Sequence, residues 1–480
     1  MNWMRMDEVQ PKAELRYARR STRGSAIAEY AIIVALISII AVFALLRLST
    51  TVQTIFEDVG ETLSSNLEAA TEDPSSFLAG GGGAPMLMTI SRSDGQPASF
   101  TFVAYGSGEI DWGDGTTTAI TTAQTEYPTH TYAGPGPYQV SFTGSLLSYG
   151  AETDKCEGID ASVNRDLVSV DDFGETGVRS LHCAFYEADN LASLAPVPAS
   201  VTDLSRMLVL SDAHPTGLDA WDVSNVTDFN HMFARMTTLN PPVAGWQMTS
   251  AKNLHGMFHL TSLDRDLSSW DVSTVENMSG LFGFMDYNYD ISNWDVSNVQ
   301  IFDQMFRGND TFDQPIGQWQ TSSATSMRQM FRHADAFDQD LRGWDVSKVT
   351  DFEYMFENTQ ATDLGLRFWD MSSAETLRHM LHASRLTEDL SGWNVSNVSD
   401  FKSTFAFSEI NADLSAWDVS SALTMEGMFN YADNYNQDLS SWTAKLSSDF
   451  CAAPDSYTNF ARHSASWTLP KPDFEAACGP

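Results

Sequence analysis

Two groups of aspartates have types and spacings that could support chemistry. Asp111 and Asp114 form a carboxylate pair suited to acid–base work or to calcium binding. A second group, one aspartate after each of several recurring tryptophans, could line up as a calcium-binding column. Its members are Asp222, Asp271, Asp295, Asp345, Asp370 and Asp418. We prefer turn and capping roles for both groups, because Asp-Gly is the residue pair expected in a tight turn and aspartate commonly caps.

The four cysteines are the other reactive residues, and they contain no C-x-x-C pair, which disfavours a zinc ribbon or a thioredoxin-like motif. They are Cys156, Cys183, Cys451 and Cys478. A separation of 27 residues recurs in the first pair and in the last pair. Two disulfides are the economical interpretation for an exported protein, but four cysteines allow three connectivities and spacing alone does not choose.

No catalytic constellation is readable along the chain: no phosphate loop, no H-E-x-x-H, and no histidines with ligand spacing. His130 has no His or Cys nearby in sequence, so we expect a structural role for it. We therefore predict no catalytic residues, no cofactor and no metal site, and an enzyme hidden in the variable loops is the least favoured class. Triads assemble in space, so their absence from the sequence is weak evidence.

Length and charge set the outer limits on function. The chain has 480 residues, of which 42% are hydrophobic, enough for two or three domains with a sizeable core. Acidic residues outnumber basic ones by 63 to 27, for a formal net charge of −36. Such a surface repels a phosphate backbone, so we exclude nucleic acid as a partner.

The amino terminus predicts a membrane anchor. A basic leader over residues 1–24 precedes a nearly unbroken apolar run over 31–46, which Arg47 closes. Counted from Ser25, the stretch has 22 residues and would extend roughly 33 Å as a helix, enough to cross a bilayer. The basic flank predicts a cytoplasmic amino end and an exported carboxyl end.

A cleavage motif lies before this apolar run rather than after it, unlike an ordinary secretory signal. Its residues are Gly24, Ser25, Ala26, Ile27, Ala28, Glu29 and Tyr30. The motif resembles the prepilin peptidase site of type IV pilins, and the Glu-Tyr pair resembles the Flp (Tad) branch. The resemblance implies cleavage between Gly24 and Ser25, a pilin helix over 25–70, and pairing of Glu29 with the amino terminus of a neighbouring subunit.

The same resemblance implies partners and a location. The partners would be prepilin peptidase and other pilin subunits, with the chain in the inner membrane before assembly and then at the cell surface or in a pilus. Flp pilins are little more than the helix, whereas this chain adds some 400 residues, so a minor or tip-like subunit fits better than a bulk pilin. A plain signal anchor is the alternative.

A Gly-rich linker over 71–85 precedes a predicted β-sandwich over 86–150, where short runs alternate apolar and polar residues between Gly- and Thr-rich turns. The segments 110–115 and 130–140 resemble the PKD-like immunoglobulin-type fold. The resemblance implies that Gly113-Asp114-Gly115 is a hairpin turn and that Trp112 is in the core. We predict that this module is a spacer.

Ten tryptophans recur every 24 or 25 residues, and a period of this size predicts a solenoid. They are Trp221, Trp246, Trp270, Trp294, Trp319, Trp344, Trp369, Trp393, Trp417 and Trp442. Apolar residues lie five, eight, eleven and twelve places after each of the first nine tryptophans, with Thr404 as the exception, and this spacing predicts one face of a short helix. Ser or Thr at the third place would cap that helix. With an extended segment before each tryptophan, we predict an α/β solenoid whose tryptophans form a core ladder.

The repeats resemble those of BspA-type bacterial surface proteins, which are leucine-rich-repeat-like. The match covers roughly residues 156–478, which we divide into a solenoid over 156–450 and a C-terminal cap over 451–480, with a disulfide expected at each end. The expected fold class is therefore a transmembrane or pilin helix, a PKD/Ig-like β-sandwich and an α/β solenoid.

The BspA resemblance implies adhesion, through an unknown extracellular protein or glycan ligand. The alternative is a structural, pseudopilin-like component of a pilus assembly or secretion machine. Aromatic residues outside the repeat pattern are candidate ligand contacts. They are Tyr287, Tyr289, Tyr354, Tyr431 and Tyr435.

Overall fold

A computed structural model describes residues 83–122, 126–151, 156, 161–453 and 455–479. The chain divides into two compact units, Met1–Phe77 and Leu78–Pro480, and every described residue belongs to the second. The predicted leader, the predicted helix over 25–70 and the predicted cleavage and assembly residues lie outside the described part. These residues are Gly24, Ser25, Glu29 and Tyr30.

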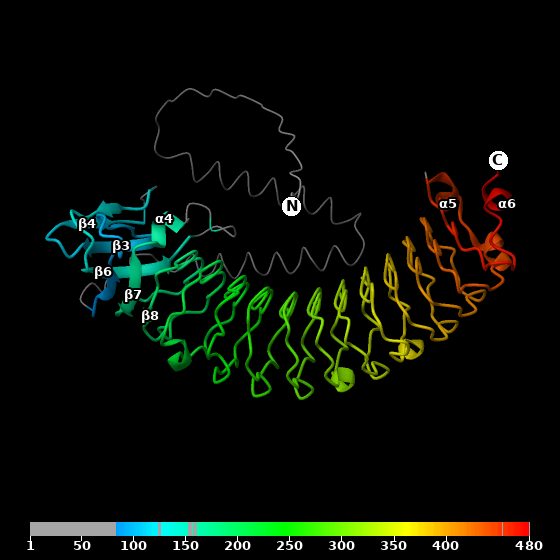
Figure 1. Ribbon diagram of the computed structural model, residues 1–480, viewed down its shortest axis with the longest axis horizontal. Coiled ribbons are helices and arrows are strands. Elements are labelled where there is room, and N and C mark those ends of the chain that lie inside the picture. Colours follow the sequence, from blue (N-terminus) through cyan, green and yellow to red (C-terminus); the bar gives the residue numbers. More distant parts are fainter. Residues whose placement is uncertain (1–82, 123–125, 152–155, 157–160, 454, 480) are drawn as a thin grey trace, which may run out of the picture. The chain divides into compact units, whose positions relative to one another are not determined.

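The described chain begins with a β module built from a six-stranded sheet of order β4-β3-β6-β1-β7-β8 and a two-stranded sheet of β2 and β5 (Figure 1). The strands are β1 (Met86–Ile90), β2 (Ser99–Thr101), β3 (Ala104–Asp111), β4 (Thr117–Ile120), β5 (Thr129–Thr131), β6 (Tyr138–Tyr149), β7 (Leu167–Asp172) and β8 (Ser193–Leu194). The large sheet extends past the boundary predicted at residue 150, because β7 pairs antiparallel with β1. β8 then pairs parallel with β7 and begins the solenoid.

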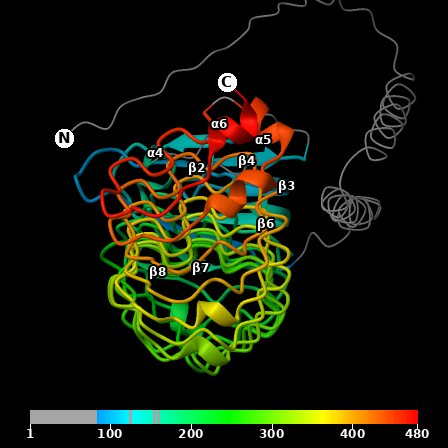
Figure 2. The ribbon, with the colours of Figure 1, turned by 90° about the vertical axis from the view of Figure 1, so that its right-hand side faces the viewer.

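The solenoid follows as a row of coils that lie side by side in chain order (Figure 1), and they superpose when viewed along the row (Figure 2). Single-residue parallel bridges join successive coils from Ser180 to Thr424. Alternate backbone amides of each coil donate to the next coil: Phe229 donates to the carbonyl of Asn253 at 2.9 Å, and His231 to that of His255 at 2.8 Å. The coils are thus joined as strands are, by main-chain hydrogen bonds between neighbours.

Our prediction of a short helix in every repeat is wrong. Residues 165–447 contain no α-helix, only four short 3-10 helices. These are η2 (Leu218–Ala220), η3 (Ile316–Gln318), η4 (Leu366–Phe368) and η5 (Ser440–Lys445). The short α-helices of the described chain are α4 (Ala161–Asn164), α5 (Ser448–Ala452) and α6 (Phe474–Cys478).

A left-handed backbone explains why no helix forms. The tenth and fourteenth residues after each repeat tryptophan up to Trp417 have positive φ, for example His379 at 53° and Ala383 at 54°. A right-handed helix cannot contain such residues at every fourth position. A helix 10–12 Å across would also not fit between coils that are bridged at the strand spacing of about 4.8 Å. The predicted helical face is instead a series of tight turns.

The expected fold class also needs correction at its amino-terminal end. Over the ranges that the structure describes, no helix combines the length and the hydrophobicity that a membrane span requires. What the structure describes is a β module followed by a solenoid of turns and bridges, rather than a pilin helix and an α/β solenoid.

The ten repeat tryptophans are buried and form one column through the solenoid. Six of the nine neighbouring indole pairs stack, with ring centroids 6.2 Å apart for Trp221 and Trp246 and 6.4 Å apart for Trp344 and Trp369. Each indole N–H after Trp221 donates to a main-chain carbonyl in the preceding coil, as Trp344 does to Ile316 at 3.0 Å. The column therefore joins the coils by both packing and hydrogen bonds.

The turn face of the solenoid as a candidate binding site

The turns of each coil place four residues on one side of the buried ladder, and we call these positions the turn face, although some of them, such as Ala234, Ser279 and Ala406, are themselves buried. They are the ninth, tenth, thirteenth and fourteenth residues after each tryptophan, together with the residues aligned with them in the opening and closing coils. The eighth, eleventh and twelfth residues are buried. Eight of the ten histidines lie on this face. They are His182, His231, His255, His259, His333, His379, His382 and His463.

Ion pairs run across several coils of the turn face. Arg328 Nε lies 3.0 Å from Glu353, and Arg378 lies 3.4 Å both from Glu353 and from Asp400. A parallel row pairs Arg332 with Glu357, and places His382 Nδ1 3.3 Å from that carboxylate. Burial opposes ionisation of Glu357, but His382 and Arg332 outweigh it and lower the pKa of the carboxyl.

Four histidines of this face have lowered pKa values, because burial disfavours the charged imidazolium. Burial lowers the pKa of His231 to about 3, with a smaller contribution from His255, whose ring centroid is 4.6 Å away. Burial also lowers the pKa values of His255 and His259, and that of His379 to about 4. Neutral imidazoles can accept a hydrogen bond or bind a metal.

Exposed aromatic rings lie near the carboxyl-terminal end of the turn face. Phe407 and Tyr431 are 50% and 41% exposed, and their rings stack at 4.7 Å. Tyr431 stacks in turn on His463 at 4.4 Å. Phe284, in an earlier coil, is 41% exposed and lies under the guanidinium of Arg307. The face therefore offers flat apolar surfaces beside charged groups.

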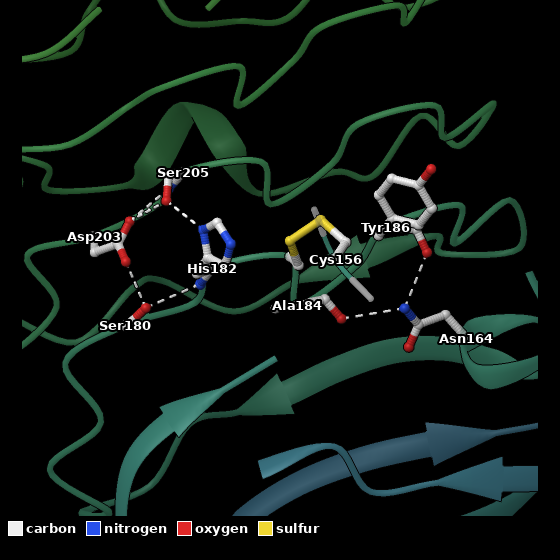
Figure 3. Close-up of a disulfide and its surroundings, with 9 residues drawn as sticks. Cys156, Asn164, Ser180, His182, Ala184, Tyr186, Asp203 and Ser205 are labelled. Carbon is white, nitrogen blue, oxygen red and sulfur yellow. Dashed lines mark hydrogen bonds between the residues drawn. A yellow bond between two sulfur atoms is a disulfide. The ribbon is translucent and has the colours of Figure 1, made fainter. Parts of the chain in front are cut away.

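A groove of about 620 Å³ lies where the opening coils meet the β module. Its lining includes His182, Ser205 and Asp203, a trio that sequence reasoning did not bring together (Figure 3). Ser205 Oγ lies 2.6 Å from His182 Nδ1 and donates to Asp203 at 2.5 Å. The hydroxyl therefore lies between the other two groups, whereas in a nucleophilic triad the histidine lies between serine and carboxylate. This trio has the bonding order of a structural network.

Comparison with known proteins places the repeats in a family. A family model described as "Mycoplasma protein of unknown function, DUF285" matches residues 179–286, 259–367 and 358–467, which together span more than half of the chain. The chain belongs to the DUF285 family. No curated protein and no solved structure matches it. Membership is consistent with the BspA-like repeat surface protein predicted above, and it carries no evidence on the Flp pilin or PKD resemblances.

The aspartate that follows the tryptophan in many DUF285 repeats has a turn role. In each of the six predicted positions its carboxylate accepts the backbone N–H of the residue two places later, as Asp345 does from Ser347 at 3.0 Å. Hydrogen bonds from Ser347 lower the pKa of Asp345. The Ser or Thr at the third place, predicted as a helix cap, is in these repeats the partner of that aspartate.

The carboxylates of the β module are also engaged in turns. Asp111 accepts the backbone N–H of Gly113 at 2.9 Å. Asp114 accepts from Thr116 and lies 2.8 Å from His130 Nε2, and these contacts lower its pKa to about 2. His130, which has no His or Cys nearby in sequence, thus has a carboxylate partner in the fold.

The structure contains two disulfides, Cys156–Cys183 and Cys451–Cys478 (Figure 3 shows the first). Of the aromatic residues predicted as ligand contacts, Tyr287 and Tyr435 are fully buried, so this prediction is wrong for them. Tyr354 and Tyr431 lie on the turn face. Aligning the repeats on their tryptophans and counting histidines column by column would have revealed the turn face from the sequence.

Proposed function

We propose that this DUF285-family protein is an exported surface protein whose solenoid binds a protein partner through the turn face. One observation carries the proposal: the turn face changes its chemistry from coil to coil, while the buried places stay apolar in every coil except for Thr404. The tenth place, for example, holds His231, Gly256, Gln304, Tyr354 and His379 in different coils, always beside a buried Met or Leu. A solenoid commonly binds through such an extended, variable face.

The residue types on this face support a protein partner. Aromatic and arginine side chains contribute most of the binding energy at protein interfaces. The turn face has both: the rings of Phe407 and Tyr431 stack on each other, and Arg332 is partly buried beside Glu357. The ion pairs of Glu353 and Glu357 would supply directional contacts on the same turn face as these two aromatic rings. Two disulfides support export, because disulfides persist in oxidising compartments.

Location is the first test. Antibodies against residues 161–453 are applied to intact and to permeabilised cells that produce the full chain. We expect binding to intact cells. Signal only after permeabilisation would contradict the proposal and favour the component of an assembly or secretion machine considered from the sequence.

Binding is the second test. The purified full chain is assayed against extracellular and cell-surface proteins and against glycans, and the Phe407→Ser/Tyr431→Ser variant is compared with it. We expect a protein ligand whose affinity falls at least tenfold in that variant. Leu423→Ser/Leu469→Ser is the matched control, since these leucines are similarly exposed, at 46% and 44%, but lie off the turn face. Equal affinity of both variants, or binding to glycans alone, would contradict the proposal.

A further inference from the structure

Two histidines and a glutamate converge on the middle of the turn face. Glu357 is contributed by one coil, and His379 and His382 by the next. One donor atom from each residue lies within 4.8 Å of the other two. The Nδ1 atoms of both histidines are buried and have no hydrogen-bond partner, although His382 Nδ1 lies 3.3 Å from Glu357 Oε1.

One of these separations, between His382 and Glu357, suits two ligands of a tetrahedral cation. Zinc binds imidazole nitrogen and carboxylate oxygen at about 2.0–2.2 Å, so two ligands of one tetrahedral ion lie about 3.3–3.5 Å apart. The distance between His382 and Glu357 has that value, while the contact lacks hydrogen-bond geometry. The third donor, on His379, lies within 4.8 Å of the other two.

The surrounding side chains orient the three donors. Arg332 binds the other carboxylate oxygen of Glu357, Oε2, and leaves Oε1 toward the histidines. The ring of Tyr354 stacks on His379 at 4.5 Å and carries the guanidinium of Arg332 on it. Such outer contacts are what fix the ligands of a metal site.

Nearby positive charge is largely compensated. Arg378 lies between Glu353 and Asp400, at 3.4 Å from each, and Lys402 pairs with Glu426. Arg332 would still repel a bound cation, because it forms an ion pair with Glu357, which is itself one of the three donors. The cations Arg378 and Lys402 thus have carboxylate partners other than Glu357, whereas Arg307, whose charge acts on Glu357, has no ion pair among the described residues.

We propose that Glu357, His379 and His382 bind one divalent transition-metal ion of the zinc type, with a fourth coordination position open to solvent. The inference concerns this cluster alone and does not depend on whether the turn face binds a protein. The other metal-type cluster within the described residues, Cys156, His182 and Cys183, has its two thiols joined in a disulfide.

The test uses the purified full chain, stripped with a chelator and titrated with Co²⁺ alone and then with Zn²⁺ in competition. We expect one Co²⁺ per chain, with the visible absorption of a tetrahedral ion that Zn²⁺ abolishes. His379→Gln and His382→Gln should each weaken binding at least tenfold. His333→Gln is the control, because His333 lies on the neighbouring coil outside the cluster, and it should bind as the wild type does.

A measurement on the wild type keeps the proposal testable if a variant misfolds. X-ray absorption of the zinc-loaded chain should report two imidazole ligands with oxygen and no sulfur. Sulfur coordination, affinity unchanged in both cluster variants, or no bound Co²⁺ at millimolar concentration would overturn the proposal.

Discussion

At the residue scale, two tryptophans of equal burial differ in hydrogen bonding and in stacking, since Trp344 stacks on two indoles and Trp221 on one. Trp344 and Trp221 are equally buried, at 4% exposure, and both stack on a neighbouring indole. Only Trp344 donates its indole N–H, to the carbonyl of Ile316, whereas the indole nitrogen of Trp221 has no partner. Trp221 opens the column, and no carbonyl of the coil before it accepts its indole N–H.

This pair predicts unequal costs for the same substitution. Phenylalanine in place of either tryptophan leaves a similar void, but Trp344→Phe also loses a buried hydrogen bond worth about 1 kcal/mol. We expect Trp344→Phe to lower the free energy of unfolding by about 1 kcal/mol more than Trp221→Phe. Urea denaturation of the two variants measures the difference, and equal losses would show that the indole hydrogen bonds add nothing to stability.

At the scale of the element, each repeat is a turn rather than a helix because its amides bond to the next coil. Hydrophobic spacing could not show this, since residues at the fifth, eighth, eleventh and twelfth places share a side in both conformations. The left-handed positions are the decisive feature, and most hold residues other than glycine, such as Tyr354 and Ala383. Nothing in the residue types marked them as left-handed.

Glycine at such a position is expected to behave oppositely to glycine in a helix. Within a helix, Ala→Gly lowers the free energy of unfolding by about 1 kcal/mol. At Ala383, where φ is 54°, the same change also removes steric strain of about 1–2 kcal/mol, which offsets the entropic cost of glycine. We therefore expect Ala383→Gly to leave stability unchanged or to raise it by up to about 1 kcal/mol. Thermal unfolding measures this against Ala336→Gly, an exposed position without positive φ. A loss of about 1 kcal/mol confined to Ala383→Gly would contradict the turn assignment.

At the scale of the whole molecule, coils interact only with their neighbours, and the ends of the row carry the disulfides. Cys451 lies in α5 and Cys478 in α6, so their disulfide joins the two helices that follow the last repeat tryptophan, Trp442. Because each coil is stabilised only by its neighbours, removing a constraint at one end destabilises the end coils and has little effect on coils further along the row. The disulfide is therefore expected to protect the carboxyl-terminal coils in particular.

Removing that disulfide should act locally. Closure of a loop over 27 residues contributes about 3–4 kcal/mol by the chain-entropy model. We expect Cys451→Ser/Cys478→Ser to speed hydrogen exchange in α5, α6 and the last coils, with little change around Trp344. Exchange that accelerates evenly along the solenoid would instead indicate that the coils unfold as one cooperative unit.

The period, the buried tryptophan column and the solenoid architecture could be predicted from the amino-acid sequence alone, because burial of apolar residues at a fixed spacing needs only a local pattern. Pairing between cysteines, and the meeting of Glu357, His379 and His382, depended on the tertiary structure. So did the choice between helix and turn. These features are set by hydrogen bonds and contacts between coils about 24 residues apart. Such contacts leave no signal within the sequence of a single repeat. The groove residues His182, Ser205 and Asp203 came together for the same reason.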